Sequence, residues 1–181
     1  MSHALVIAHP APLPRTSLAD RLAATRAALA RVSKAPAPSQ MRAELLAAYA
    51  EQRGCMPLFD CEKDHYGTAG HSAGLRVDWR LRDLLSAVIK APTPTTLEGL
   101  RTLALAMAID AEGNLSRGQH GDCDVEYGLA ARALVILTNV ALPAGFTGFG
   151  DEPDHEAREA ALMSGPVTVP AWACEAAARS A

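Results

Sequence analysis

The sequence predicts an all-α protein, an irregular bundle of about five to six helices. Apolar residues recur at three- and four-residue steps along much of the chain, which is the period of a helix with one buried face. No run of alternating β-branched residues is long enough to indicate a sheet. Hydrophobic residues make up 49% of the chain but aromatic residues only 4%, and alanine is abundant, so the large side chains suffice for one modest core.

The 181 residues fit one domain with less ordered ends. We expect residues 1–15 to form a flexible N-terminal tail, residues 16–165 a single helical domain, and residues 166–181 a weakly ordered C-terminal tail. The apolar stretch near the start is shorter than the core of a secretory signal, and the longest apolar run is about half of what a bilayer requires. The sequence therefore predicts a soluble, cytoplasmic protein.

The first helix is expected from Ser17 to about Ser33. The Ser17 hydroxyl can cap the free N–H groups of its first turn. Leu18, Leu22 and Leu29 fall on one narrow apolar seam, a spacing typical of helices that pair with another helix. We interpret this seam as a contact surface for another protein or for a second copy of the chain.

Pro36 and Pro38 interrupt the chain after this helix. Ser39 is expected to cap a second helix, which Gly54 ends in the left-handed conformation that glycine tolerates. The stretch from residue 54 to residue 77 has no helical period and is rich in glycine. We therefore expect a long loop there, which in a small domain is either functional or mobile.

A third helix is expected from Trp79 to about Lys90, with Asp78 as its cap. Its apolar residues are spaced by three and four, and they are Leu81, Leu84, Leu85 and Val88. Trp79 lies off that face, so the helix cannot bury it against the same core. We interpret Trp79 as a further contact residue.

The next two helices are expected to form the buried centre of the domain. Thr95 and Glu98 make a capping box for the first of them, which should end near Gly113. Residues 103–109 in this helix and residues 133–142 in the following one are apolar on all sides, which is typical of a helix surrounded by protein.

The second of these helices should start near Asp124 and stop at Pro143. Arg132 is the only charge in its central and last turns, so the side chain is expected to reach solvent, pair with an acid or contact a partner. After a glycine-rich loop, Asp154 can cap a short helix that ends near Ser164.

The strongest candidate for a chemical site is the set Cys55, Cys61, His65 and His71. Thiolate and imidazole are preferred zinc ligands, and four of them complete a tetrahedron. A zinc ion would also stabilise a loop with few apolar residues. The spacing lacks the tight cysteine pair of zinc fingers. The alternative therefore stays open that the cysteines pack as small hydrophobic residues and the histidines lie in solvent.

A second cluster contains His120, Asp122, Cys123 and Asp124, just before the helix that carries Arg132. It could supply further metal ligands or a Cys–His nucleophile pair, because a thiol near imidazole and a helix start has a lowered pKa. The competing interpretation is that the two acids cap the helix. No third group can be assigned to orient the histidine, which favours capping.

The net charge of −3 and the pI near 6.0 give no strong nucleic-acid footprint. A DNA-binding regulator would have to use the helices on either side of residues 91–95, with Arg80, Arg82 and Lys90 against phosphates. The summed charge opposes this third hypothesis.

Residues 89–101 read Ile-Lys-Ala-Pro-Thr-Pro-Thr-Thr-Leu-Glu-Gly-Leu-Arg. This stretch resembles a segment of small uncharacterised helical proteins from alphaproteobacteria and their mobile elements, in which a Pro-x-x-Thr-x-x-Gly-Leu turn caps a helix. The resemblance covers residues 78–140 and departs at Thr102-Leu103 and at the Cys/His loop. It implies an all-helical bacterial protein and no particular activity.

Together these patterns favour a protein–protein interaction or accessory module without catalysis, which binds an unknown protein or associates with itself. The expected contact residues are Leu18, Leu22, Leu29, Trp79 and Arg132. The alternative is a small zinc-binding protein that uses residues 55–71; no other cofactor and no membrane are expected.

Overall fold

The structure is a computed structural model that describes residues 37–60, 65–115 and 122–179. These residues form six α-helices and one 3-10 turn and contain no strand, which confirms the all-α prediction. The elements are α2 (Pro38–Cys55), η1 (Met56–Phe59), α3 (Ala69–Ile89), α4 (Leu97–Leu115), α5 (Asp122–Thr138), α6 (His155–Met163) and α7 (Ala171–Ala178). Residues 1–36 form a separate unit outside the described residues, and the contact residues Leu18, Leu22 and Leu29 belong to it.

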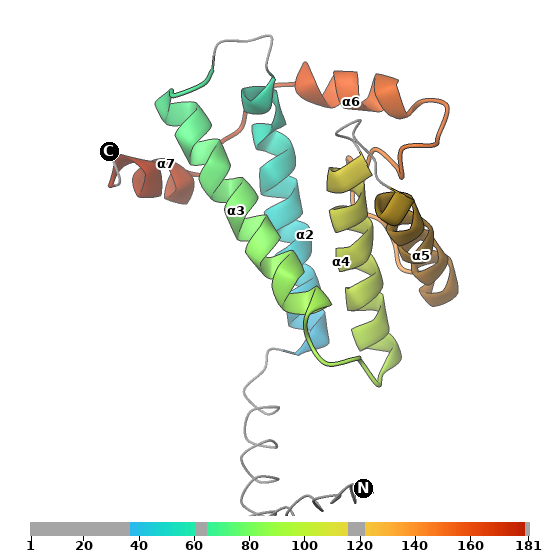
Figure 1. Cartoon of the computed structure of the whole chain (residues 1–181). Helices are drawn as coiled ribbons and strands as arrows, with labels where there is room; N and C mark the ends of the chain where they lie inside the picture. Colours follow the sequence, from blue (N-terminus) through green and yellow to red (C-terminus); the bar gives the residue numbers. More distant parts are fainter. Residues whose placement is uncertain (1–36, 61–64, 116–121, 180–181) are drawn as a thin grey trace, which may run out of the picture. The chain divides into compact units, whose positions relative to one another are not determined.

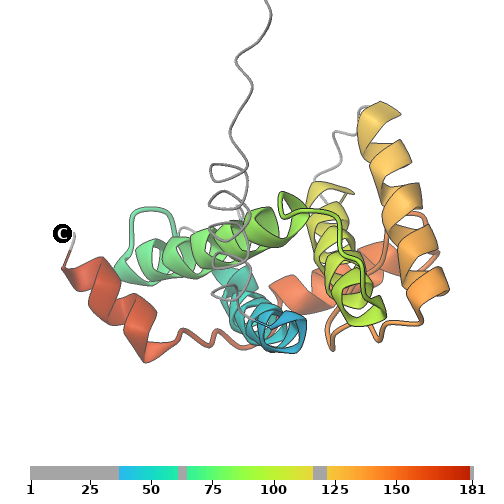
Figure 2. The ribbon, with the colours of Figure 1, turned by 90° about the horizontal axis from the view of Figure 1, so that it is seen from below.

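The core lies between α2, α3 and α4, which pack on one another (Figure 1). Its largest cluster of buried side chains comes from all three helices and includes Leu45, Tyr49, Leu81, Leu85, Leu105 and Ile109. The other helices add to the outside of this core: α5 packs on α4, α6 on η1 and α7 on α3. Figure 2 shows α5 and α7 on opposite sides of the three core helices. Within the described ranges, no helix has the length and apolar character needed to span a membrane.

The prediction of two buried central helices is right for α4 and wrong for α5. On α4, Leu105 is 0% exposed and its neighbours on several sides are buried as well. On α5, Ile136 is 71% and Leu137 80% exposed, although the sequence around them is equally apolar on all sides. The helix also stops at Thr138, because Asn139 has a φ of 50°, so the expected run to residue 142 is not helical.

Helix α3 begins at Ala69, and the expected start at Trp79 is wrong. The Thr68 hydroxyl accepts a hydrogen bond from the His71 N–H at 3.1 Å and so caps the helix. The turns that follow, which the sequence predicts to be a loop, are therefore helical. Asp78, the expected cap, lies inside the helix.

Two glycines obscure this early start of α3 in the sequence, because glycine weakens a helical pattern. Gly70 and Gly74 both face η1. A Cβ atom at Gly74 would lie 3.3 Å from Leu58 Cδ1 and 3.3 Å from Phe59 Cζ. The glycine therefore allows η1 to pack closely on the first turns of α3.

Two other helix starts differ from the prediction by one or two residues. Helix α2 starts at Pro38, whose ring suits the first helical position, so Ser39 is not its cap. In α4, the Gly99 N–H donates to Thr96 Oγ1 at 3.1 Å, so Thr96 and not Thr95 caps the helix. These shifts leave the order of the expected helices unchanged.

Helix α7 lies within residues 166–181, for which the sequence predicts weak order. Its residue Ala173 is fully buried and belongs to a second cluster with residues of α2, η1 and α3, namely Cys55, Leu58, Ala73 and Val77. The segment before α7 is bound to the end of α2, where the Thr168 N–H donates to the Gly54 carbonyl at 2.7 Å.

Alanine substitutions at Gly54 and at Gly113 can be compared to measure how tightly the end of α2 is packed. A Cβ at Gly54 would lie 2.9 Å from the Thr168 carbonyl oxygen, whereas a Cβ at Gly113 of α4 would have no atom within 4 Å. Gly54 is not left-handed, so this close approach is the reason for glycine there. We expect Gly54→Ala to lower the free energy of unfolding by about 1–2 kcal/mol, and Gly113→Ala to raise it by up to about 1 kcal/mol. Urea unfolding measures both, and equal changes would contradict the tight contact.

Candidate interaction surface

A buried carboxylate fastens the loop after α5 to the core. Glu112 on α4 is 1% exposed, and its Oε1 accepts hydrogen bonds from Thr147 N at 2.6 Å and Thr147 Oγ1 at 2.8 Å. Its Oε2 accepts from Tyr49 Oη at 2.9 Å and from Arg53 Nη2 at 2.5 Å. Helix α2, helix α4 and the loop are therefore joined at one point.

The electrostatics of Glu112 fit a structural role. Burial raises the pKa of Glu112, while Arg53, Thr147 and Tyr49 act against that rise. Burial and the neighbouring Glu112 also raise the pKa of Tyr49, so the phenol remains a hydrogen-bond donor. A buried acid with a shifted pKa is often catalytic. Here the hydrogen bonds come from the chain itself and the carboxylate is closed to solvent, so we assign it to stability.

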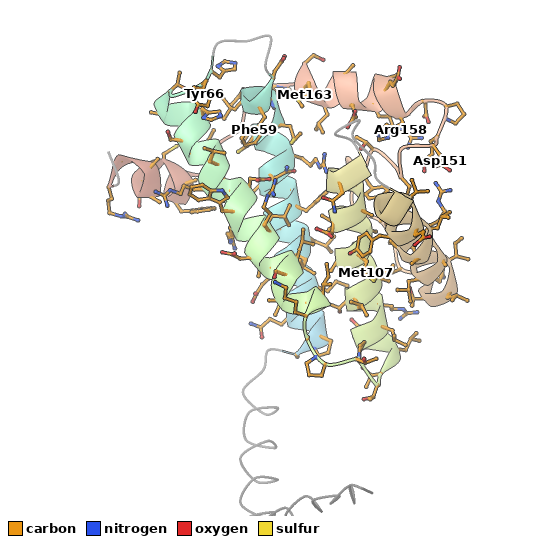
Figure 3. The ribbon with its side chains drawn as sticks, in the orientation of Figure 1. Phe59, Tyr66, Met107, Asp151, Arg158 and Met163 are labelled. Carbon is orange, nitrogen blue, oxygen red and sulfur yellow. The ribbon has the colours of Figure 1, made fainter. Side chains whose placement is uncertain are left out.

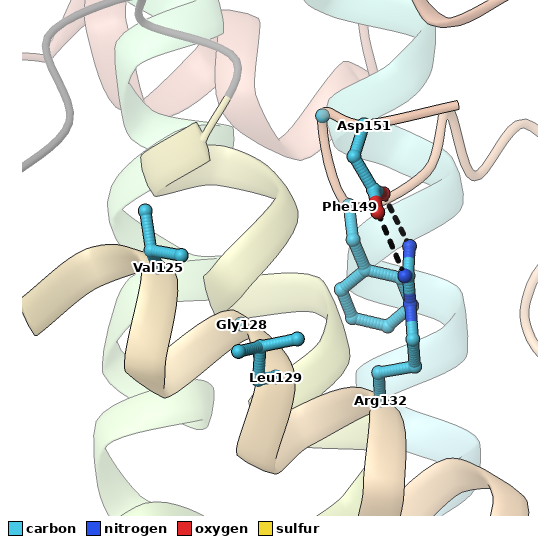
Figure 4. Close-up of a pocket in the computed structure, with 7 residues that line it drawn as sticks. Val125, Gly128, Leu129, Arg132, Phe149 and Asp151 are labelled. Carbon is cyan, nitrogen blue, oxygen red and sulfur yellow. Dashed lines mark hydrogen bonds and ion pairs between the residues drawn. The ribbon is translucent and has the colours of Figure 1, made fainter. Parts of the chain in front are cut away.

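Arg132 fastens α5 to the same loop. Its Nη1 donates to Asp151 Oδ2 at 2.8 Å, and its Nη2 donates to Asp151 Oδ1 (Figure 4). Nη2 also lies 3.0 Å from Glu152 Oε1, and the guanidinium carbon lies 5.0 Å from the centre of the Phe149 ring. The hydrogen bond from Arg132 lowers the pKa of Asp151. Pairing with an acid is therefore confirmed, while contact with a partner stays a prediction.

Small residues allow α5 to lie close to α4. Ala131 of α5 and Ala111 of α4 are fully buried and pack together. Three larger side chains surround them, namely Met107, Tyr127 and Phe149. Met107 is labelled on α4 in Figure 3. Because this packing fixes one side of α5, it also fixes which residues of α5 point outward.

The outward face of α5 is apolar. With about 100° of rotation per residue, its exposed positions share one side of the helix. They are Val125, Glu126, Leu129, Ala130, Ala133, Ile136 and Leu137. Val125 is 49% exposed, Leu129 59%, Ile136 71% and Leu137 80%, and Glu126 is the single charge among the described side chains of this face. A helix on the surface of a core normally turns its polar residues outward, so α5 has the opposite pattern.

A small hollow of about 200 Å³ lies beside this face, between α5 and the loop (Figure 4). Its lining residues are Val125, Gly128, Leu129, Arg132, Phe149, Gly150 and Asp151. Pockets for small molecules usually measure about 300–1,000 Å³. The hollow is therefore smaller than a usual small-molecule pocket.

A wider groove of about 570 Å³ is lined by residues of α2, α3 and α6. Its two arginines are each held by a carboxylate, Arg82 by Asp78 at 2.7 Å and Arg53 by Glu112 at 2.5 Å. Both guanidinium groups of the groove are therefore paired with carboxylates of the chain itself.

Of the predicted zinc ligands, Cys55 is buried at the end of α2. Its thiol lies 3.5 Å from the Thr168 carbonyl oxygen and donates to it. Burial, with a smaller contribution from Glu51, raises the pKa of Cys55 to about 11. A zinc ligand has to be the thiolate, so this surrounding favours the protonated, packed state of the cysteine.

This protonated state predicts how Cys55 reacts. We expect iodoacetamide at mildly alkaline pH to modify the exposed Cys174 quickly and to leave Cys55 unmodified until the chain is unfolded with urea. Peptide mapping by mass spectrometry identifies the modified sulfur. If iodoacetamide modified Cys55 and Cys174 at equal rates in the folded protein, the Cys55 thiol would be open to solvent and the prediction would be wrong.

The two predicted histidine ligands lie near the start of α3. His71 contacts the rings of Phe59 and Tyr66, with centroid distances of 5.9 and 5.3 Å; both partners are labelled in Figure 3. The His65 carbonyl accepts a hydrogen bond from Thr68 Oγ1 at 2.7 Å. Cys61 lies outside the described residues.

No group of three or more His, Cys, Asp or Glu side chains able to hold a metal occurs within the ranges that the structure describes. The set proposed for zinc includes Cys61, which is not among them, so zinc stays a prediction. Elemental analysis of the purified protein, with a Cys55→Ser or His71→Ala chain as control, tests it directly.

The remaining predicted residues are partly covered. Trp79 is 50% exposed, and the guanidinium carbon of Arg76 lies 5.2 Å from its ring centre. Its exposure agrees with a side chain that is off the core, and its role as a contact residue stays a prediction. His120 and the side chains of residues 122–124 lie outside the described part.

Two features of this region were not predicted from the sequence. The first is the buried Glu112, which the sequence could have indicated because an acid stands there near the end of a largely apolar helix. The second is the apolar outward face of α5. A helix that is apolar on all sides fits a surface that a partner covers as well as it fits the centre of a domain. No protein-family model, no curated protein and no solved structure matches the chain, so its function has to be inferred from these contacts.

Proposed function

We propose that the chain is a protein–protein interaction module without catalysis and that the outward face of α5 is its binding surface. The observation that carries this proposal is the exposure of Ile136 and Leu137, at 71% and 80%, on a helix whose other side is packed. Apolar surface in water is unfavourable, and burial against a partner removes that cost. Contiguous exposed apolar patches on soluble domains mark interaction sites more often than chance.

The contacts on the inner side of α5 support the proposal. Arg132 holds the loop through Asp151, and Glu112 holds the same loop through Thr147. Neither contact involves the outward face, so that face is available for a partner without any loss of the fold. The candidate acid Glu112 is closed to solvent, which supports binding rather than catalysis.

We expect a Leu137→Gln chain to keep its free energy of unfolding within about 0.5 kcal/mol, because the side chain is 80% exposed, and to lose binding. The stability is measured by urea unfolding at low protein concentration. A loss of several kcal/mol would show that the residue belongs to the core and not to a binding surface.

Binding is measured by photo-cross-linking in cells of the organism whose genome encodes the chain. A photoreactive phenylalanine analogue at position 137 should give a covalent adduct with a protein, whereas the same analogue at the exposed position 87 of α3 should not. An absence of adducts at position 137 would overturn the proposed function.

A further inference from the structure

The outward face of α5 has a mirror order around its central residue. Leu129 and Leu137 each lie four residues from Ala133, and Ala130 and Ile136 each lie three residues from it. At about 100° per residue, Ala133 also lies in the middle of the face defined by these four neighbours. A two-fold axis through Ala133 therefore exchanges Leu129 with Leu137 and Ala130 with Ile136.

This order is what a symmetric pair of helices requires. In a two-fold interface the same patch is used by both copies, so residue i must suit residue j and residue j must suit residue i. Around Ala133, leucine would meet leucine and alanine would meet isoleucine, so that large and small side chains alternate. At the axis itself, alanine would meet alanine, which allows two helices to approach closely.

The area of the face reaches the lower limit for an interface between two copies. Its four large exposed side chains, Val125, Leu129, Ile136 and Leu137, form a patch on the scale of the largest apolar patch of a typical monomer, roughly 500 Å² per copy. Two copies would bury about 1,000 Å², which is the lower limit for a specific interface. Glu126, which carries the one charge among the exposed α5 side chains that the structure describes, lies outside the mirror set and would remain at the rim, where charges keep their water.

We infer that the outward face of α5 binds the outward face of α5 in a second copy of this chain, antiparallel, with the two-fold axis at Ala133. This inference rests on the proposed function, because it names the partner of the same surface. It predicts two properties that can be measured separately. The first is that the purified protein forms a dimer, and the second is the register in which the two helices pack.

The first measurement is sedimentation equilibrium of the full chain from about 1 to 200 μM, a range that brackets the affinity expected for an interface of this size. We expect a monomer–dimer equilibrium. Leu137→Glu should raise the dissociation constant at least tenfold, because it places a carboxylate opposite Leu129 of the other copy. Val167→Glu is the matched control, since Val167 is an apolar residue 46% exposed outside α5, and it should leave the equilibrium unchanged.

The second measurement is disulfide cross-linking, in a chain in which the cysteines other than the buried Cys55, namely Cys61, Cys123 and Cys174, are replaced by serine. Helix axes about 8–10 Å apart with Cα atoms at a radius of about 2.3 Å place the two Ala133 Cα atoms within disulfide range. Ala133→Cys should therefore oxidise to a linked dimer. Ala130→Cys should not, because its two copies would be displaced by six residues, or about 9 Å, along the helices.

The outcomes separate the two proposals. A dimer that Leu137→Glu dissociates and Ala133→Cys locks supports the inference. A monomer at all concentrations, or a dimer that Ala130→Cys links and Ala133→Cys does not, overturns it. If the purified chain is a monomer while position 137 cross-links to a different protein, the inference is wrong and the proposed function stands. If neither dimer nor adduct forms, both are wrong.

Discussion

A Glu112→Ala chain is expected to lose about 3–5 kcal/mol of unfolding free energy. The substitution removes the acceptor of Tyr49 Oη, Arg53 Nη2 and both donors of Thr147. It leaves the Arg53 side chain, which is only 14% exposed, without its carboxylate. Removing one partner of a buried pair has a large effect because the other charge stays buried and uncompensated.

Thermal and urea unfolding followed by circular dichroism measure this loss, which for a chain of this size corresponds to a fall in Tm of about 6–20 °C. The matched control is Glu98→Ala on the same helix. Glu98 pairs with Arg42 at 3.0 Å, with side chains 35% and 33% exposed, so we expect a loss of about 1 kcal/mol or less. Equal losses in the two variants would contradict the view that Glu112 joins α2, α4 and the loop.

A Leu105→Ala chain is expected to lose about 2–5 kcal/mol, the usual cost of a cavity at a fully buried leucine. Leu105 is 0% exposed and belongs to the cluster between α2, α3 and α4. The neighbouring side chains come from three helices, so the site cannot collapse without moving one of them. The measurement is urea unfolding, with the m-value as a check that the unfolding remains two-state.

The control for this variant is Leu137→Ala, measured at concentrations where the chain is monomeric. Leu137 is 80% exposed, so we expect a change of about 0.5 kcal/mol or less. The comparison is informative because the two leucines lie in stretches of similar sequence. If both variants lost several kcal/mol, α5 would be a second core helix and the proposed surface would not exist.

Local signals in the sequence were sufficient to predict that the chain is helical and where most helices are interrupted. Proline acts on its own neighbours through its fixed φ and missing N–H, so the starts of α2 and α4 fall within a few residues of the prediction. The start of α3 was missed for a different reason. Gly74 lies inside the helix and faces η1, and no local pattern in the sequence reports such a contact.

The candidate surface could be predicted only in part, because burial depends on what surrounds a helix. Residues 103–109 and 133–142 carry the same apolar pattern, yet the first stretch is enclosed by α2, α3 and α5, whereas the helical part of the second packs on α4 and turns its other side outward. The sequence does contain the mirror order around Ala133. That order indicates helix pairing only when the face is known to be exposed, which the sequence alone does not show.

The pairing of Arg132 with Asp151 has a consequence for how this chain can change. Folding depends on the inner side of α5, and recognition is assigned to its outer side, so the two properties are encoded by different residues of one helix. If the proposed function holds, substitutions at the outer positions change which partner is bound and leave the free energy of unfolding nearly unchanged. Helix α5 is therefore a suitable element in which to redesign a binding surface while the residues that hold the fold are kept.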